Sequence, residues 1–136
     1  MLAIRRRDNG HWEPPGGVLE LNESILGGLV REVAEETGLV VEAERLTGVY
    51  KNMVRGIVAL VFRCRIVGGR PASSSEVSEA AWLSADEARD VMSEAYSSRV
   101  LDALTDGVPA VRAHDGQRLA GTRDVTTPGA LGPRPG

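Results

Sequence analysis

The 136-residue sequence has little of what several specialised protein classes need. Its single cysteine, Cys64, excludes an intrachain disulfide and an all-cysteine zinc site, and fits a reducing compartment. No apolar run approaches the ~20 residues of a membrane-spanning helix, and the apolar start of the chain is too short for a secretory signal. A formal net charge of −3 gives no reason to expect nucleic-acid binding. We therefore expect a cytoplasmic protein with neither a membrane nor a nucleic acid as partner.

The chain has the length of one domain. Periodic apolar patterns cover residues 2–104, and we assign residues 1–118 to a single domain built on that core. Residues 119–136 are rich in glycine and proline and offer too little apolar surface to offset the entropy of ordering. We expect this segment to be a disordered tail.

Local patterns predict a mixture of strands and helices. Alternating or β-branched runs predict strands over 2–7, 18–21, 39–42, 45–50, 57–67 and 79–83. Asn22 or Ser24 can cap a first helix that Thr37-Gly38 closes, and the capping box at Ser84 predicts a second helix to about Met92. A last helix is capped by Ser97 or Ser98 and ends at Leu104. This order of elements is typical of an α/β or α+β fold with a mixed sheet.

The helix over 24–37 carries two separate stripes. Apolar side chains at helical spacing predict a core-facing stripe of Leu26, Leu29, Val30, Val33 and Thr37. Glu32, Glu35 and Glu36 are spaced i, i+3 and i+4, so they neighbour one another about 130° away from that stripe. Three adjacent carboxylates repel one another, and they are also the hard oxygen ligands that Mg²⁺ or Mn²⁺ prefers. Taken alone, this spacing is more typical of a solvated acidic face than of a metal site.

The surrounding residues change that interpretation. The segment from Gly17 to Leu39 resembles the Nudix hydrolase signature at every fixed position, and Trp12 and Pro15-Gly16-Gly17 resemble the approach to it. The residues that carry the resemblance are Gly17, Glu23, Arg31, Glu32, Glu35, Glu36, Gly38 and Leu39. The resemblance covers roughly residues 2–104.

The resemblance implies an α/β/α sandwich with a mixed central sheet. It also implies hydrolysis, with Mg²⁺ or Mn²⁺, of the pyrophosphate bond of a nucleoside diphosphate linked to another group. Carried over by position, Glu32, Glu35 and Glu36 are the metal ligands, and the Gly16 carbonyl joins them. Glu32 is also a candidate general base, and Glu23 and Arg31 form an ion pair that fixes the motif.

Physical chemistry supports these roles. A pyrophosphate is strongly anionic, so a bare acidic cluster repels it, whereas a divalent cation reverses the local charge and lowers the pKa of water. A nearby carboxylate then accepts the proton. A guanidinium such as that of Arg31 is suited to holding a carboxylate in a fixed fork.

Other charged residues are weaker candidates. Glu76 and Glu79 lie in or beside a loop that the resemblance places near the metal. Candidates for contacts with substrate phosphate are Arg7, Lys51 and Arg55. Trp12 is expected to pack beneath the glycines, and Cys64 to lie in the core. His11 and His114 are isolated, show no metal-ligand spacing and receive no role.

The sequence differs from the family pattern at the first strand. Nudix domains usually begin with a strand before the one over 2–7, so here the first strand is missing or shortened, or another segment fills the sheet. A homodimer that covers the exposed edge is one hypothesis. Nucleoside triphosphates, nucleotide sugars and dinucleoside polyphosphates stay open as substrates. The alternatives to an enzyme are a nucleotide-sensing module and an acidic surface for protein contacts or calcium.

Overall fold

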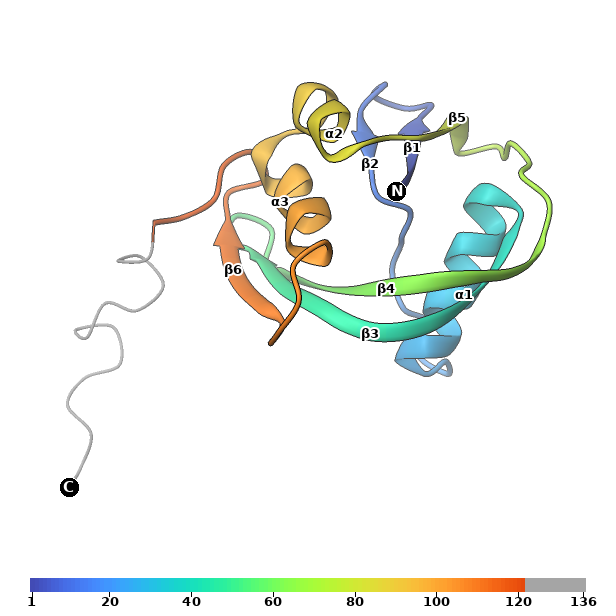
Figure 1. Cartoon of the computed structure of the whole chain (residues 1–136), viewed down its shortest axis with the longest axis horizontal. Helices are drawn as coiled ribbons and strands as arrows, with labels where there is room; N and C mark the ends of the chain where they lie inside the picture. The colour runs from blue at the N-terminus through green and yellow to red at the C-terminus, as the bar shows by residue number, and fades with distance from the viewer. Residues whose placement is uncertain (122–136) are drawn as a thin grey trace.

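The computed structural model describes residues 1–121 of the chain. These residues form three helices and six strands, arranged as in Figure 1. In chain order they are β1 (Leu2–Arg6), β2 (Trp12–Glu13), α1 (Ile25–Thr37), β3 (Leu39–Asn52), β4 (Ile57–Gly69), β5 (Val77–Trp82), α2 (Ala85–Val91), α3 (Glu94–Ala103) and β6 (Ala110–His114). None of the helices in this part of the chain is long and apolar enough to cross a membrane.

The strands form two three-stranded sheets. One has the order β2-β1-β5 and is antiparallel throughout. The other has the order β4-β3-β6, in which β4 is antiparallel and β6 parallel to β3. In Figure 1 the long β3–β4 pair runs along one side of the molecule, with α1 and α3 lying over its two ends. The predicted α/β fold with a mixed sheet is therefore confirmed.

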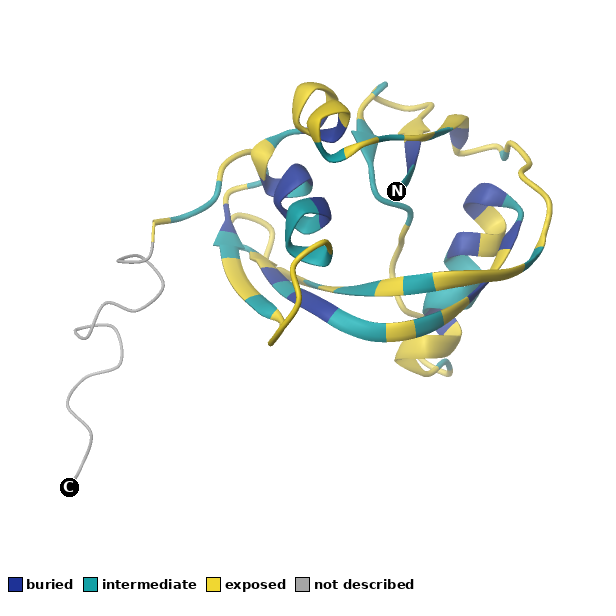
Figure 2. Cartoon of the chain, viewed as in Figure 1, coloured by how far each residue is buried: buried dark blue, intermediate teal, exposed yellow. Residues whose placement is uncertain are grey.

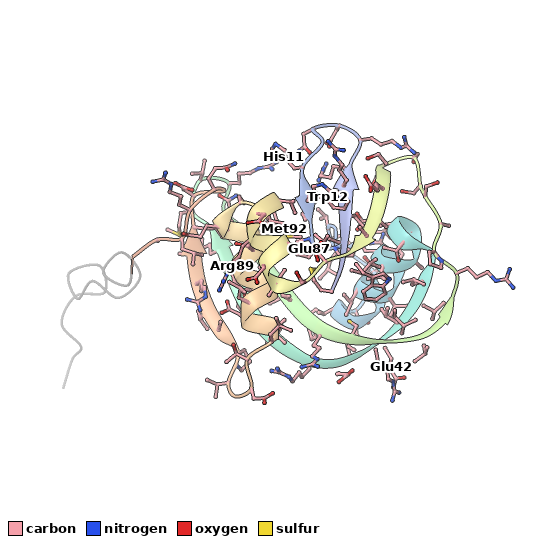
Figure 3. All side chains as sticks on the ribbon, turned by 45° about the horizontal axis from the view of Figure 1, so that its top comes forward. His11, Trp12, Glu42, Glu87, Arg89 and Met92 are labelled. Carbon is pink, nitrogen blue, oxygen red and sulfur yellow. The ribbon has the colours of Figure 1, made fainter. Side chains whose placement is uncertain are left out.

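Two apolar clusters hold these layers together. Val33 on α1 packs with Leu39 and Val41 on β3, and Cys64 borders this cluster. A second cluster joins β1 to α2 and α3. It contains Ala3, Ala88, Met92 and Val100, and Trp12 packs against it (Figure 3). Figure 2 shows the buried residues on the inward faces of α1, α3 and β3. Each fully buried aliphatic side chain stabilises the fold by about 1.5–3 kcal/mol.

Helix α1 begins and ends where the sequence predicts. The Ser24 hydroxyl accepts a hydrogen bond from the Gly27 N–H at 3.0 Å, and Gly38 closes the helix in the left-handed conformation at φ 76°. Val33 and Thr37 are buried as expected, but Leu26 is 50% exposed. Gly28 is buried instead, because the preceding loop packs on the other side of the first helical turns.

Several element predictions are wrong. Residues 18–21 form no strand, because side chains of the motif bind the Val18 C=O and the Glu20 N–H that a sheet would need. The two strands predicted over 39–42 and 45–50 are one strand, β3, with a bulge between them. Ser93, not Ser97 or Ser98, precedes the last helix, and both of those serines are buried within it.

Strand β6 was not predicted. Its residues alternate only weakly, and its partner β3 lies about sixty residues earlier in the chain. The segment beyond it contacts the domain as well. The Leu119 N–H donates to Glu94 at 2.7 Å and the Ala120 N–H donates to the Ala113 carbonyl at 2.8 Å. The first residues of the predicted tail are therefore hydrogen-bonded to β6 and α3, and residues 122–136 lie outside the described residues.

Candidate functional site

The acidic stripe (Glu32, Glu35 and Glu36) lies on the C-terminal half of α1. The packing of Val33 and Thr37 on β3 fixes the rotation of the helix and so decides where the three carboxylates point. Their exposure differs, since the Glu35 side chain is 60% exposed, that of Glu32 16%, and Glu36 as a residue only 6%. Glu36 is therefore partly removed from water, whereas Glu35 remains at the surface.

Arg31 connects the stripe to Glu23. Its Nε and Nη2 atoms donate to the two Glu23 carboxylate oxygens at 2.8 and 2.5 Å, which is a two-point fork. This fork holds the pKa of Glu23 at about 2, well below its ordinary value, and raises that of Arg31. The remaining nitrogen, Nη1, donates to Glu32 at 2.9 Å and to Glu35 at 3.1 Å. Arg31 thus donates hydrogen bonds to three carboxylates, but it holds only Glu23 with two nitrogens, and Glu20 lies at a longer 3.9 Å from its Nε.

The glycine loop (residues 14–24) crosses directly over the acidic stripe. The Gly16 N–H donates to Glu36 Oε1 at 2.7 Å. At Gly17 the backbone lies so close to Glu32 that an added Cβ would overlap the carboxyl group. The Val18 carbonyl accepts from Arg31 Nη2 at 3.2 Å. Glycine at position 17 is therefore needed for space, because only the absence of a side chain lets loop and carboxylate meet.

Glu36 is the buried member of the stripe. Burial raises its pKa to about 7, opposed by the Gly16 hydrogen bond and reinforced by the charges of Glu32, Glu13 and Glu76. These four acids are thus close enough to act on one another, which is unfavourable unless positive charge is supplied. A carboxyl group with this pKa exchanges its proton near neutral pH.

Glu13 was missed by the sequence reasoning. It ends β2 immediately before the glycine loop, and its side chain is 14% exposed. Burial raises its pKa, and its one salt bridge among the described residues is a long contact of 3.4 Å to Arg6. No spacing rule singles it out; its place directly before Pro14 was the available signal.

The weaker candidates differ in whether they lie near the acidic stripe. Glu76 is near, because its charge acts on Glu36, and its carbonyl accepts from the Arg7 N–H at 3.0 Å. The Arg7 side chain is used by the backbone, since its Nε donates to the Ser74 carbonyl at 3.1 Å. Glu79 faces Arg5 across the β1–β5 ladder.

Lys51 and Arg55 are not brought to the acidic stripe. Lys51 is exposed near the far end of β3, and Arg55 is exposed in the following turn, where its N–H donates to the Asn52 side chain at 3.0 Å. Within residues 1–121, no hydrogen bond or ion pair links either of them to α1.

The donor set of the stripe has the right chemistry for a hard divalent cation. It consists of carboxylate oxygens beside the Gly16 backbone, and the acids around Glu36 repel one another. Arg31 contacts Glu32 and Glu35, and in the described part of the chain no three acidic, histidine or cysteine side chains converge on one point. A cation would therefore compete with Arg31 Nη1 for these two carboxylates, while Glu23 retains the other nitrogens.

Comparisons with known proteins agree with this geometry. A family model described as the NUDIX domain matches residues 1–104. The chain is 58% identical over 119 residues to a MutT-like protein of Streptomyces ambofaciens, covering 88% of this chain and 77% of that protein. It is 33% identical over 87 residues to an ADP-ribose pyrophosphatase of Methanocaldococcus jannaschii, covering 59% and 52% of the two chains. An ADP-ribose pyrophosphatase structure from Streptococcus suis superposes with a TM-score of 0.67 at 25% identity, over 83% of this chain and 88% of that one.

Proposed function

Because the chain belongs to the Nudix family and is a hydrolase acting on pyrophosphate bonds, we propose that it cleaves a nucleoside diphosphate linked to another group. We further propose that it needs Mg²⁺ or Mn²⁺. The observation that carries the proposal is the meeting of the glycine loop with Glu32 and Glu36, held in place by the Arg31–Glu23 fork. A solvated acidic face has no need of a loop that lies against its carboxylates.

Glu32, Glu35 and Glu36 would hold the cation together with the Gly16 carbonyl. Such a cation, when bound, neutralises diphosphate charge and lowers the pKa of water. Glu35 is the most exposed of the three and so the most accessible to an incoming ion. Glu76 is a further candidate ligand because its charge already acts on Glu36.

Two residues of the motif hold the others in position. Glu23 fixes Arg31, and Arg31 in turn fixes Glu32 and the Val18 carbonyl of the loop. Because the guanidinium of Arg31 stays protonated throughout the accessible pH range, Arg31 exchanges no proton during the reaction. Its contribution is to keep the loop and the helix at a constant separation, so that the carboxylates meet the diphosphate in one arrangement.

Two carboxylates are candidates for the general base. The family resemblance assigns Glu32, whereas the pKa of about 7 at Glu36 in the metal-free protein makes it a site that accepts a proton near neutral pH. The Gly16 N–H occupies Glu36 Oε1, so Oε2 is the oxygen open to a proton. A bound cation would lower this raised pKa, which favours the ionised ligand form at the same position.

The leaving group is less closely defined. Relatives and neighbours include proteins named ADP-ribose pyrophosphatase and a UDP-X diphosphatase, of which the latter, at 18% identity, shows the fold alone. ADP-ribose, nucleoside triphosphates, nucleotide sugars and dinucleoside polyphosphates therefore belong in one substrate panel. Each presents an anionic diphosphate to the same acidic stripe.

The test is to incubate the protein with each substrate of this panel, with and without Mg²⁺ or Mn²⁺, and to measure the phosphate-containing products. Glu32→Gln and Glu36→Gln should each lower kcat by about 100-fold or more with the fold retained. Glu42→Gln is the matched control, because Glu42 lies on the outer side of β3 with its side chain 62% exposed (Figure 3). Nucleotide binding without any product would instead support a sensing module.

A further inference from the structure

The connection between β4 and β5, residues 70–76, passes the C-terminal end of α1 (Figure 1). It is attached there by direct contacts. The Ala72 N–H donates to the Thr37 carbonyl at 2.8 Å, and the Arg70 N–H donates to the Gly38 carbonyl at 3.2 Å. Both acceptors directly follow the acidic stripe in the sequence, so the first part of the connection is fixed beside the buried end of the stripe.

The other end of the connection forms a tight turn that leads into β5. The Val77 N–H donates to the Ser74 hydroxyl at 3.2 Å, which closes the turn. Val77 is 1% exposed and lies opposite Arg6 in the β1–β5 ladder, so it anchors the turn in the core. Glu76 is the last residue before this anchor and is exposed. Its carboxylate therefore extends from a backbone whose position the turn and the anchor define.

Arg7, which directly follows β1, holds this turn at two points. Its backbone N–H donates to the Glu76 carbonyl at 3.0 Å, and its side-chain Nε donates to the Ser74 carbonyl at 3.1 Å. The sequence suggested that the Arg7 side chain contacts substrate phosphate. In the structure its Nε is instead directed at the backbone of the segment that carries Glu76. One arginine thus ties the end of β1 to both sides of the turn.

From these contacts we propose that Arg7 is a positioning residue that keeps the Glu76 carboxylate beside Glu36. The inference rests on the proposed function, in which Glu76 is a candidate ligand of the cation. Like charges repel, so a Glu76 carboxylate on an unrestrained backbone would turn away from Glu36. The Nε hydrogen bond to Ser74 opposes this movement, because it holds the turn from the side of β1.

The atom that makes this contact allows a positioning role to be separated from a phosphate contact. Glutamine carries its amide nitrogen as many bonds from Cα as arginine carries Nε, but it has no charge. Arg7→Gln therefore keeps a donor for the Ser74 carbonyl and removes the charge, whereas Arg7→Met removes both. Arg7→Lys keeps the charge that a phosphate contact requires. A positioning role predicts that glutamine replaces arginine well, and a phosphate contact predicts that only lysine does.

The structural step is tested on the full chain without metal and without substrate. Hydrogen exchange of the Val77 amide reports how often the turn opens, because this N–H is bonded to Ser74 within it. Arg7→Met should speed this exchange by about threefold to tenfold, and Arg7→Gln by less than about twofold. Arg5→Met is the matched control, because Arg5 Nε also donates to a backbone carbonyl, that of Gly10 at 3.0 Å, away from the turn. An unchanged Val77 exchange rate in Arg7→Met overturns the proposal.

The functional step is a double-mutant cycle on the best substrate of the panel. Arg7→Met should lower kcat by about threefold to tenfold with KM nearly unchanged, and Arg7→Gln should restore most of the loss. In a Glu76→Gln background the same Arg7→Met change should cost less than about twofold, because the group it acts through is gone. A loss that persists in that background, or one that lysine but not glutamine restores, overturns the proposal in favour of a phosphate contact. If the wild type hydrolyses nothing, the proposed function fails, and Val77 exchange still decides whether Arg7 holds the turn.

Discussion

The substitution Gly17→Ala is expected to reduce activity strongly while changing the stability of the fold very little. The added Cβ would overlap the Cδ and both oxygens of Glu32, so the carboxylate has to move by roughly 1 Å to reach ordinary contact distance. Glu32 can give way, because the overlapping atoms are the far end of a flexible side chain. The expected result is a folded protein whose Glu32 no longer meets the loop.

The two contributions to stability nearly cancel. An off-rotamer Glu32 costs about 0.5–1.5 kcal/mol. Alanine lowers the entropy of the unfolded chain and so stabilises the fold by about 0.4–1 kcal/mol. This gain applies because the φ angle of Gly17 is not in the left-handed region. The thermal midpoint should therefore shift by no more than roughly 5 °C. Activity should fall by about 100-fold, because a displacement of this size at a catalytic group has that effect.

The assay pairs thermal unfolding with steady-state kinetics on the best substrate of the panel. Gly68→Ala is the remote control, because its Cβ would lie 3.7 Å from Val40, an ordinary contact. Gly16→Ala keeps its backbone groups and its Cβ meets nothing within 4 Å, so it should lose far less activity than Gly17→Ala. A Gly17→Ala enzyme with kcat/KM within about threefold of the wild type would refute the proposed role of the loop.

Three further predictions concern stability. Because the pKa of Glu36 is raised to about 7, the folded state without metal loses stability as pH rises from about 4.5 to about 7. In urea unfolding, Glu36→Gln should therefore have a higher free energy of unfolding than the wild type at pH 8 but not at pH 4, and equal differences at both pH values would contradict this. The lowered pKa of Asp102 means that its ion pair with Arg112 stabilises the fold above about pH 4 and is lost at lower pH, so Asp102→Asn should cost about 1–3 kcal/mol at pH 7 and much less at pH 3. In Gly38→Ala, the new side chain would sit at a φ of +76° and overlap the Arg70 carbonyl, so the free energy of unfolding should fall by more than about 1 kcal/mol. Thermal unfolding measures this, and an unchanged midpoint would show that the end of α1 adjusts without cost.

Local signals predicted the helix that carries the stripe with good accuracy. Ser24 and Gly38 bound α1 as their capping chemistry requires, and the spacing of the three glutamates places them on one side of it. The fork between Glu23 and Arg31 spans eight residues, and the family resemblance had paired them. Helix geometry alone sets the separations within the stripe, whereas Glu23 precedes the helix and its pairing with Arg31 was implied by the resemblance.

Short-range patterns could not predict the contacts between residues that are far apart in the sequence. Strand β6 exists because β3 offers it an edge, and nothing within 110–114 marks it as a strand. Glu13 joins the acids around Glu36 only because the β1–β2 hairpin brings it there. His114 received no role from the sequence, since its relation to Arg99 depends on how β6 lies against α3.

Isothermal titration of Mg²⁺ and Mn²⁺ into the protein, with and without a non-hydrolysed nucleotide, tests the metal dependence of the acidic stripe most directly. We predict saturable binding that Glu32→Gln weakens by about tenfold or more and that Glu42→Gln leaves intact. An absence of binding by either cation, with nucleotide present and the protein folded, would contradict the assignment of Glu32, Glu35 and Glu36 as metal ligands.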